Sequence, residues 1–158
     1  MIVQIKKITD IDDLTLSIIT DWMYNWWGIE DGYSYEAVRC RMKHSCNEDR
    51  LPQTYGLYLN DKLIGMYQFS LEDVFVQPDL YPWLACVYIS EEYRNKGYGR
   101  ILMESVEVHA KENLNFEELY LFTKHETLYE KFGWEFVSNI ETYKQNDSVQ
   151  KLYKKKLQ

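Results

Sequence analysis

Trp83-Leu-Ala-Cys-Val-Tyr-Ile89, followed by Ser-Glu-Glu-Tyr-Arg94-Asn-Lys-Gly97-Tyr-Gly99-Arg100, is the stretch that decides the fold. Its first part is apolar or aromatic without alternation, which predicts a strand buried on both faces. The two glycines that come next predict a turn where the backbone can approach a ligand closely. Beyond them, Leu102, Val106 and Ala110 recur every fourth residue, which predicts one face of an amphipathic helix that ends near Asn113.

A strand, a glycine turn and a helix N-terminus in this order gather unpaired backbone NH groups and the positive end of a helix dipole at one place. Arg94, Lys96 and Arg100 add positive charge around it. The stretch therefore predicts a site for a bound pyrophosphate. It is neither the phosphate-loop pattern, since the Gly-Lys-Ser/Thr ending is missing, nor the dinucleotide pattern Gly-x-Gly-x-x-Gly, since position 102 is Leu.

The pattern Arg94-x-x-Gly97-x-Gly99, after an apolar strand and before a helix, resembles the acyl-CoA signature of the GNAT N-acetyltransferase superfamily. A second stretch makes the resemblance more specific. Leu119-Tyr-Leu-Phe-Thr123 predicts another strand, and Leu128-Tyr129-Glu-Lys-Phe-Gly133-Trp134 follows it. The latter is similar to the Tyr-Glu-Lys-x-Gly-Phe segment that closes the family's cofactor site. Together the motifs cover about residues 55–137, whereas the N-terminal third resembles the family only in its order of elements.

The resemblance implies an α/β (α+β) fold with a mixed, splayed central sheet, and a single N-acetyltransferase domain over residues 1–158. A chain of 158 residues is long enough for one such domain and its core. The residue pattern predicts further strands over about 2–5, 54–59, 62–71, 118–122, 134–143 and 149–157, and helices over about 12–28, 34–47 and 126–132. The run Lys154-Lys155-Lys156 is interpreted as a charged strand end that resists aggregation.

The net charge of −7 argues against a protein that binds nucleic acid by neutralising phosphates, and it favours the approach of cationic substrates. Cys40, Cys46 and Cys86 are odd in number and lack Cys-x-x-Cys spacing, so we expect neither a disulfide framework nor a metal site. The sequence shows no secretory leader and no apolar run of membrane-spanning length. We therefore expect a cytoplasmic protein without a membrane or nucleic-acid partner, and its state as monomer or homodimer stays open.

The resemblance places acetyl-CoA, as co-substrate, along the central strand and the glycine turn. Backbone groups of Val87 and Ile89 would bind the pantetheine arm, and an NH near Val87 would polarise the thioester carbonyl. The residues expected to bind acetyl-CoA are Val87, Tyr88, Ile89, Arg94, Asn95, Lys96, Gly97, Tyr98, Gly99 and Arg100. An NH bonded to a charged phosphate oxygen is worth about 1.5–3 kcal/mol, so several of them outweigh the exposed charge of Lys96.

Tyr129 holds the family's general-acid position. A phenol with an ordinary pKa of about 10 is protonated at neutral pH and can donate a proton to the departing thiolate. The base that deprotonates the amine stays open, because residues 83–89 lack the carboxylate that some relatives carry on this strand. Glu72 and Asp73, at the end of the neighbouring strand, are substitutes, and His125 is another candidate. Cys86 is interpreted as a small buried hydrophobe instead of a nucleophile.

The aromatic end of the first helix and the loop after it are candidates for the acceptor side. Trp26 and Trp27 suit either the core or an acceptor cleft in which rings hold a cation, and the resemblance puts the first helices beside the acceptor. Glu30 and Asp31 are either solvated loop carboxylates or partners of an ammonium group.

The sequence thus predicts an N-acetyltransferase that moves acetyl directly from acetyl-CoA to a primary amine, with a small cationic acceptor such as a polyamine or an aminoglycoside. Two alternatives stay open. A peptide or protein N-acetyltransferase would present an open groove, and a non-catalytic acyl-CoA-binding regulator would keep the anchor without the reaction.

Overall fold

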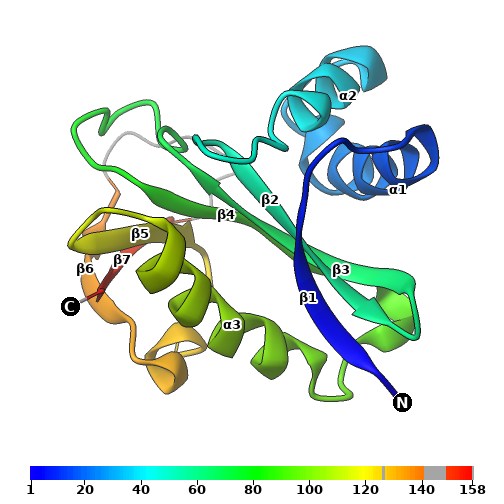
Figure 1. Ribbon diagram of the computed structural model, residues 1–158. Helices are drawn as coiled ribbons and strands as arrows, with labels where there is room; N and C mark the ends of the chain where they lie inside the picture. Colours follow the sequence, from blue (N-terminus) through cyan, green and yellow to red (C-terminus); the bar gives the residue numbers. More distant parts are fainter. Residues whose placement is uncertain (126, 141–148, 158) are drawn as a thin grey trace. The chain divides into compact units, whose positions relative to one another are not determined.

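The computed structural model, shown in Figure 1, describes residues 1–125, 127–140 and 149–157. Its residues form two compact units. The first comprises Met1–Phe69 and Cys86–Leu102, and the second comprises Ser70–Ala85 and Met103–Gln158. The strand β4 (Trp83–Ile89) belongs to both, because the chain passes from the second unit to the first between Ala85 and Cys86.

The sheet of the first unit begins with three antiparallel strands, β1 (Val3–Ile8), β2 (Gln53–Leu59) and β3 (Lys62–Ser70). Asn60 and Asp61 join β2 to β3 with φ angles of 48° and 66°, as expected for a two-residue hairpin turn. β4 is the next strand in the order, beside β3. The Ser90 NH, just after β4, donates to the Ile64 carbonyl of β3 at 2.8 Å, which fixes where β4 ends against its neighbour.

Two helices, α1 (Asp13–Met23) and α2 (Tyr35–Lys43), pack side by side in the first unit (Figure 1). The Asp12 carboxylate caps α1 by accepting from the Thr15 NH at 2.7 Å, and the Ser34 hydroxyl caps α2 in the same way. Both helices contribute to a core with two strand residues: Leu16, Ile19, Met23, Val38, Met42, Leu63 and Met66. Leu14, in the first turn of α1, lies outside this core and is 73% exposed.

The second unit contains three further strands. Residue Trp83 of β4 pairs in parallel with Tyr120 of β5 (Glu118–Thr123), and β5 pairs antiparallel with β7 (Lys151–Lys156), which pairs antiparallel with β6 (Glu135–Asn139). The helix α3 (Tyr98–Asn113) begins in the first unit and continues in the second. The strand order is therefore β1-β2-β3-β4-β5-β7-β6, with parallel and antiparallel pairs. The expected mixed α/β fold is confirmed.

Four local predictions need correction. The helix predicted over 12–28 is α-helical only to Met23 and continues as a π-helical turn, η1 (Tyr24–Gly28). The helix predicted over 126–132 is a short 3-10 turn, η3 (Tyr129–Phe132), because φ is positive at Thr127 before it and at Gly133 after it.

The third correction concerns β4, which is buried only over its first half, while its residues from Cys86 onward are half-buried. Cys86 has a φ of 54°, which interrupts the extended backbone at the point where burial changes. Cys86 is accordingly half-buried instead of buried, although it packs against the core of the first unit. The fourth correction concerns the basic run, since Lys155 is buried instead of forming part of a solvated strand end. The end of the strand predicted over 134–143, from residue 141 onward, and the connection to the strand predicted over 149–157 lie outside the described residues.

Candidate active site

The glycine turn of the first unit lies between a short 3-10 turn, η2 (Glu91–Tyr93), and the start of α3. Asn95 and Gly97 have φ angles of 61° and 90°, with Lys96 between them. Left-handed residues in such a turn aim successive NH groups toward one concave point, which is the geometry that binds anions.

The backbone NH groups of this turn are available to a ligand. Among the described residues, the structure gives no protein acceptor for the NH groups of Lys96, Gly97, Tyr98 and Gly99. The first helical bond here runs from the Ile101 NH to the Gly97 carbonyl at 3.4 Å. Four consecutive donors thus stand at the positive end of the α3 dipole, on an exposed turn.

The two glycines of the motif, Gly97 and Gly99, differ in whether the backbone conformation requires glycine. Gly97 needs to be glycine for its own backbone, because a φ of 90° strains any other residue. Gly99 has no such conformation, and a Cβ built on it would meet nothing within 4 Å. The protein alone therefore gives no steric reason for glycine at position 99, whereas a phosphate lying against this turn would give one.

The cations around the turn are bound to the protein itself. Arg94 Nε donates to the Ile89 carbonyl at 2.7 Å, and its guanidinium lies 5.0 Å from the centre of the Tyr88 ring. Lys96 Nζ donates to the Glu92 carbonyl at 2.9 Å. Arg94 therefore ties the turn to the end of β4, a structural role that the sequence did not reveal.

Tyr88 is the centre of an aromatic cluster in the first unit. Its ring centroid lies 5.1 Å from that of Trp22 and 5.9 Å from that of Trp26, so both indoles lie against it. The structure thus brings a candidate acceptor residue, Trp26, next to a candidate cofactor residue, Tyr88. Trp22 is a member of this cluster that sequence reasoning missed, and its spacing of four residues from Trp26 is a signal that could have found it.

The other acceptor candidates of the first unit lie in different surroundings. Trp27 Nε1 donates to Met23 Sδ at 3.3 Å, and its ring makes an edge contact with that of Tyr33 at 6.0 Å. The π-helical bond from the Ile29 NH to the Tyr24 carbonyl widens the turn that carries both tryptophans. Trp27 is half-buried and Trp26 is 47% exposed, so Trp26 is the better placed of the two to meet a ligand.

The carboxylates of the loop after η1 are open to solvent. Glu30 and Asp31 are both exposed, and the Asp31 NH donates to the Trp27 carbonyl at 2.9 Å. They can attract a cation by long-range charge, but their exposure weakens any single ion pair.

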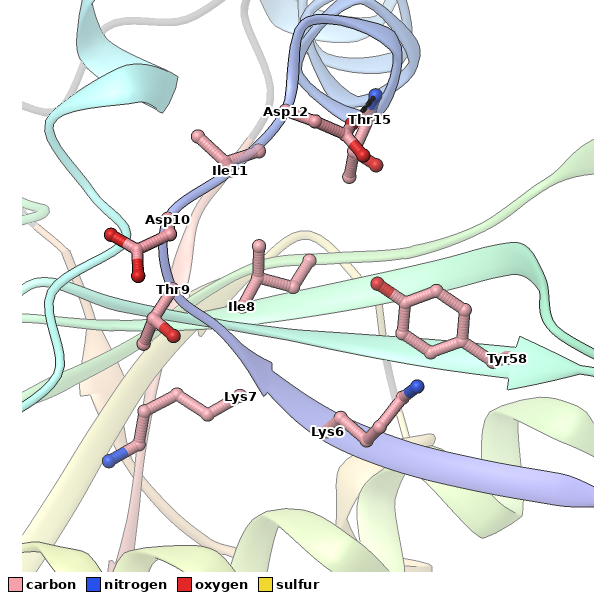
Figure 2. Close-up of a pocket in the computed structure, with 9 residues that line it drawn as sticks. All are labelled: Lys6, Lys7, Ile8, Thr9, Asp10, Ile11, Asp12, Thr15 and Tyr58. Carbon is pink, nitrogen blue, oxygen red and sulfur yellow. Dashed lines mark hydrogen bonds between the residues drawn. The ribbon is translucent and has the colours of Figure 1, made fainter.

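Two hollows lie in the first unit, and one of them is lined by Trp22 of the aromatic cluster around Tyr88. One, of about 380 Å³, lies between α1 and the β2–β3 hairpin, and Trp22 and Ser90 contribute to its wall. The other, of about 220 Å³, lies where β1 turns into α1 (Figure 2). In Figure 2 the Asp12 carboxylate meets the Thr15 NH, and the Lys6 ammonium lies 4.5 Å from the Tyr58 ring centre. Two polar groups of this second hollow, those of Asp12 and Lys6, thus already have partners within the protein.

The catalytic candidates belong to the second unit. Tyr129 begins η3, and its ring lies 6.4 Å from that of Trp134 and 6.1 Å from that of Tyr153. Burial raises the pKa of the Tyr129 phenol above its ordinary value of 10.0. The phenol therefore stays protonated at neutral pH, as a general acid requires.

One of the three base candidates, Asp73, is half-buried, whereas Glu72 and His125 are exposed residues of the connections that follow β3 and β5. The His125 NH donates to the Thr123 hydroxyl at 3.1 Å. Among the described residues, the structure gives no hydrogen bond from the Glu72 or His125 side chain to Tyr129, so the choice between these two is not made by direct contact.

The sequence matches the model of the acetyltransferase (GNAT) family over residues 16–134, which is most of the chain. The chain belongs to this GNAT family. The resemblance carried by the two motifs is thus confirmed, and membership identifies the protein as an acetyl-CoA-dependent acyltransferase. No curated protein sequence matches the chain.

Solved GNAT structures have the same fold. An aminoglycoside 6'-N-acetyltransferase complexed with coenzyme A has a TM-score of 0.75 and 13% identity, covering 98% of this chain and 97% of that one. An aminoglycoside 6'-acetyltransferase type Ii gives 0.75 and 15% over the same shares. A GNAT acetyltransferase from Elizabethkingia anophelis with acetyl-CoA bound gives 0.67 and 16%, again over 98% and 97%. At such low identities the likeness shows the fold.

The described residues contain neither a membrane-spanning helix nor a cluster of metal ligands. No described helix combines the length and the apolar character needed to cross a bilayer. Within the same residues, no three His, Cys, Asp or Glu side chains gather as metal ligands would.

Proposed function

We propose that this GNAT protein transfers acetyl from acetyl-CoA directly to a primary amine of a small cationic molecule. The observation that carries the proposal is the row of four NH donors at residues 96–99, together with a glycine at position 99 that the fold does not need. A pyrophosphate bound there would direct the pantetheine arm along β4, where Val87 and Ile89 are half-buried.

The chemistry assigns one role to each group. The NH near Val87 polarises the thioester carbonyl, and the neutral amine attacks the carbonyl carbon. The C–S bond then breaks, and Tyr129 gives its phenolic proton to the leaving thiolate sulfur. The amine loses its own proton to a base reached through water, with Glu72 as the first candidate and His125 as the second.

The acceptor class rests on charge and on rings. The net charge of −7 and the exposed Glu30 and Asp31 attract a cation, and the exposed face of Trp26 can hold one. Two of the structural neighbours are aminoglycoside acetyltransferases, which is consistent with an amine of this type.

Release of free CoA thiol from acetyl-CoA tests the proposal across polyamines, aminoglycosides, amino acids and peptides. We expect turnover with a small polycation and little with peptides. Preference for a peptide N-terminus or lysine would favour the protein acetyltransferase instead. Tight CoA binding without turnover on any amine would favour a non-catalytic regulator.

A further inference from the structure

Lys155 is a buried lysine of the second unit, only 8% exposed. Its Nζ donates to the Phe132 carbonyl at 2.6 Å and lies 3.5 Å from the Glu107 carboxylate of α3. Phe132 is the last residue of η3, the turn that Tyr129 begins. The ammonium therefore satisfies a carbonyl at the C-terminal end of that turn, where a cation is favourable.

Gly133 leaves room for this contact. Its φ of 84° already calls for glycine, and a Cβ at this position would lie 2.7 Å from Lys155 Nζ. The glycine of the Tyr129-Glu-Lys-Phe-Gly133 motif thus serves both to end the turn and to admit the lysine.

A second residue of β7 holds the same turn at its other end. Tyr153 stands two residues before Lys155, so both side chains leave the same face of the strand. The Tyr153 hydroxyl donates to Glu130 Oε1 at 2.6 Å, and its ring lies 6.1 Å from that of Tyr129. Contacts from one face of β7 therefore reach η3 at Glu130 and at Phe132.

Stability alone is a weak reason for this burial. A buried ammonium is costly unless it is paired, and an apolar replacement for a buried ion pair is often neutral for stability. Glu107 also binds Lys111 at 2.9 Å, so the carboxylate keeps a partner without Lys155. What Lys155 adds beyond that pair is the bond to the carbonyl of η3.

We infer that Lys155 is a positioning residue for Tyr129, which fixes the turn so that the phenol points its proton at the leaving thiolate. The inference rests on the proposed role of Tyr129 as general acid. Lys155 itself touches neither substrate nor reacting atom. It acts through the Phe132 carbonyl and the backbone of η3.

Lys155→Met tests this, because it keeps the length of the side chain while it removes the charge and the donor. Lys154→Met is the matched control, since Lys154 is the next residue on β7 and has a carboxylate partner, Glu118, at 3.8 Å. We expect Lys155→Met to lower kcat by about 10- to 100-fold, the cost of a small misplacement, with KM for acetyl-CoA unchanged. Lys154→Met should keep the wild-type kcat, and Lys155→Arg, which keeps a cationic donor, should retain more kcat than Lys155→Met.

Two further readouts separate positioning from general damage. In a Tyr129→Phe background, Lys155→Met should cause no further loss of kcat. In Lys155→Met the pKa of Tyr129, measured by carbon NMR of its ring, should fall toward the ordinary value of about 10, because a loosened turn admits water. An equal loss in both backgrounds, or a wild-type kcat with an unchanged titration, would overturn the inference. If the wild type acetylates no amine while the titration still moves, the proposed function fails and the positioning of Tyr129 stands.

Discussion

Gly99→Ala is the substitution that separates an effect on CoA binding from an effect on the stability of the protein. Gly99 is the second residue of α3, and the added methyl group would meet no atom of the protein within 4 Å. Because alanine loses less backbone entropy than glycine in a helix, the change should stabilise the free protein by about 0.5–1 kcal/mol. For a chain of this size, this corresponds to a rise in Tm of about 1–4 °C.

The same methyl group would stand where a phosphate approaches the turn. Losing one NH bond to a charged oxygen costs about 1.5–3 kcal/mol, which weakens CoA binding by about 10- to 140-fold. Isothermal titration calorimetry with CoA and thermal unfolding of the free protein measure the two effects. A more stable variant that binds CoA far more weakly is the expected result.

Two controls bracket this experiment. Gly97→Ala should also weaken CoA binding, but it should lower stability by about 1–3 kcal/mol, since φ at Gly97 is 90°. Lys96→Ala should weaken binding less than either, because its ammonium is bonded to the Glu92 carbonyl. Unchanged CoA affinity in Gly99→Ala would refute the placement of the pyrophosphate at this turn.

Three further results are expected. Tyr129→Phe should lower kcat by about 100-fold or more. Since burial raises the pKa of Tyr129, deprotonation of this phenol should lower the wild-type kcat only above pH 10. A fall in kcat at lower pH that Tyr129→Phe abolishes would contradict the assignment. Trp26→Ala should raise KM for the amine with little change in Tm, because Trp26 is exposed. Trp27→Ala should lower the free energy of unfolding by roughly 2 kcal/mol, because the half-buried Trp27 packs on Met23. The opposite pattern would exchange their roles. The Thr15 NH lowers the pKa of the Asp12 carboxyl below its ordinary value of 3.8. The stabilisation of the fold by this charged cap is therefore fully present above pH 3.8 and is lost as the pH falls through the lowered pKa. The difference in Tm between wild type and Asp12→Ala should shrink in acid, and a constant difference would exclude the charged cap.

The stretch around β4 was predictable because its signals are local. An unbroken apolar run, two glycines and a four-residue spacing lie next to one another in the chain, and the strand was found at the expected residues 83–89. The caps at Asp12 and Ser34 and the turn at residues 60–61 are local for the same reason.

The contacts around Tyr88 and Tyr129 were not predictable because they join residues far apart in the sequence. Trp22 lies 66 residues before Tyr88, and nothing in its helical spacing tells a core position from one against that ring. The π-helical turn is marked by hydrogen bonds that span five residues, such as the one from the Ile29 NH to the Tyr24 carbonyl, and the sequence offers no pattern for them.

Lys155 was misjudged for a different reason. Three consecutive lysines look like a solvated strand end, and they hide the alternation by which Tyr153 and Lys155 share the buried side of β7. The neighbouring Lys154 is indeed partly exposed. The Phe132 carbonyl and the Glu107 carboxylate, both distant from Lys155 in the sequence, explain why a lysine is buried there.

The central claim is that backbone NH groups at one turn bind the pyrophosphate of CoA. A proton–nitrogen NMR titration of the protein with CoA tests it directly, because each amide reports on its own hydrogen bond. We predict that the largest saturable shifts occur at the amides of residues 96–99. In Lys96→Ala the shifts of these four amides should keep the same rank order as in the wild type. Saturable binding of CoA that leaves these four amides unshifted would contradict the account.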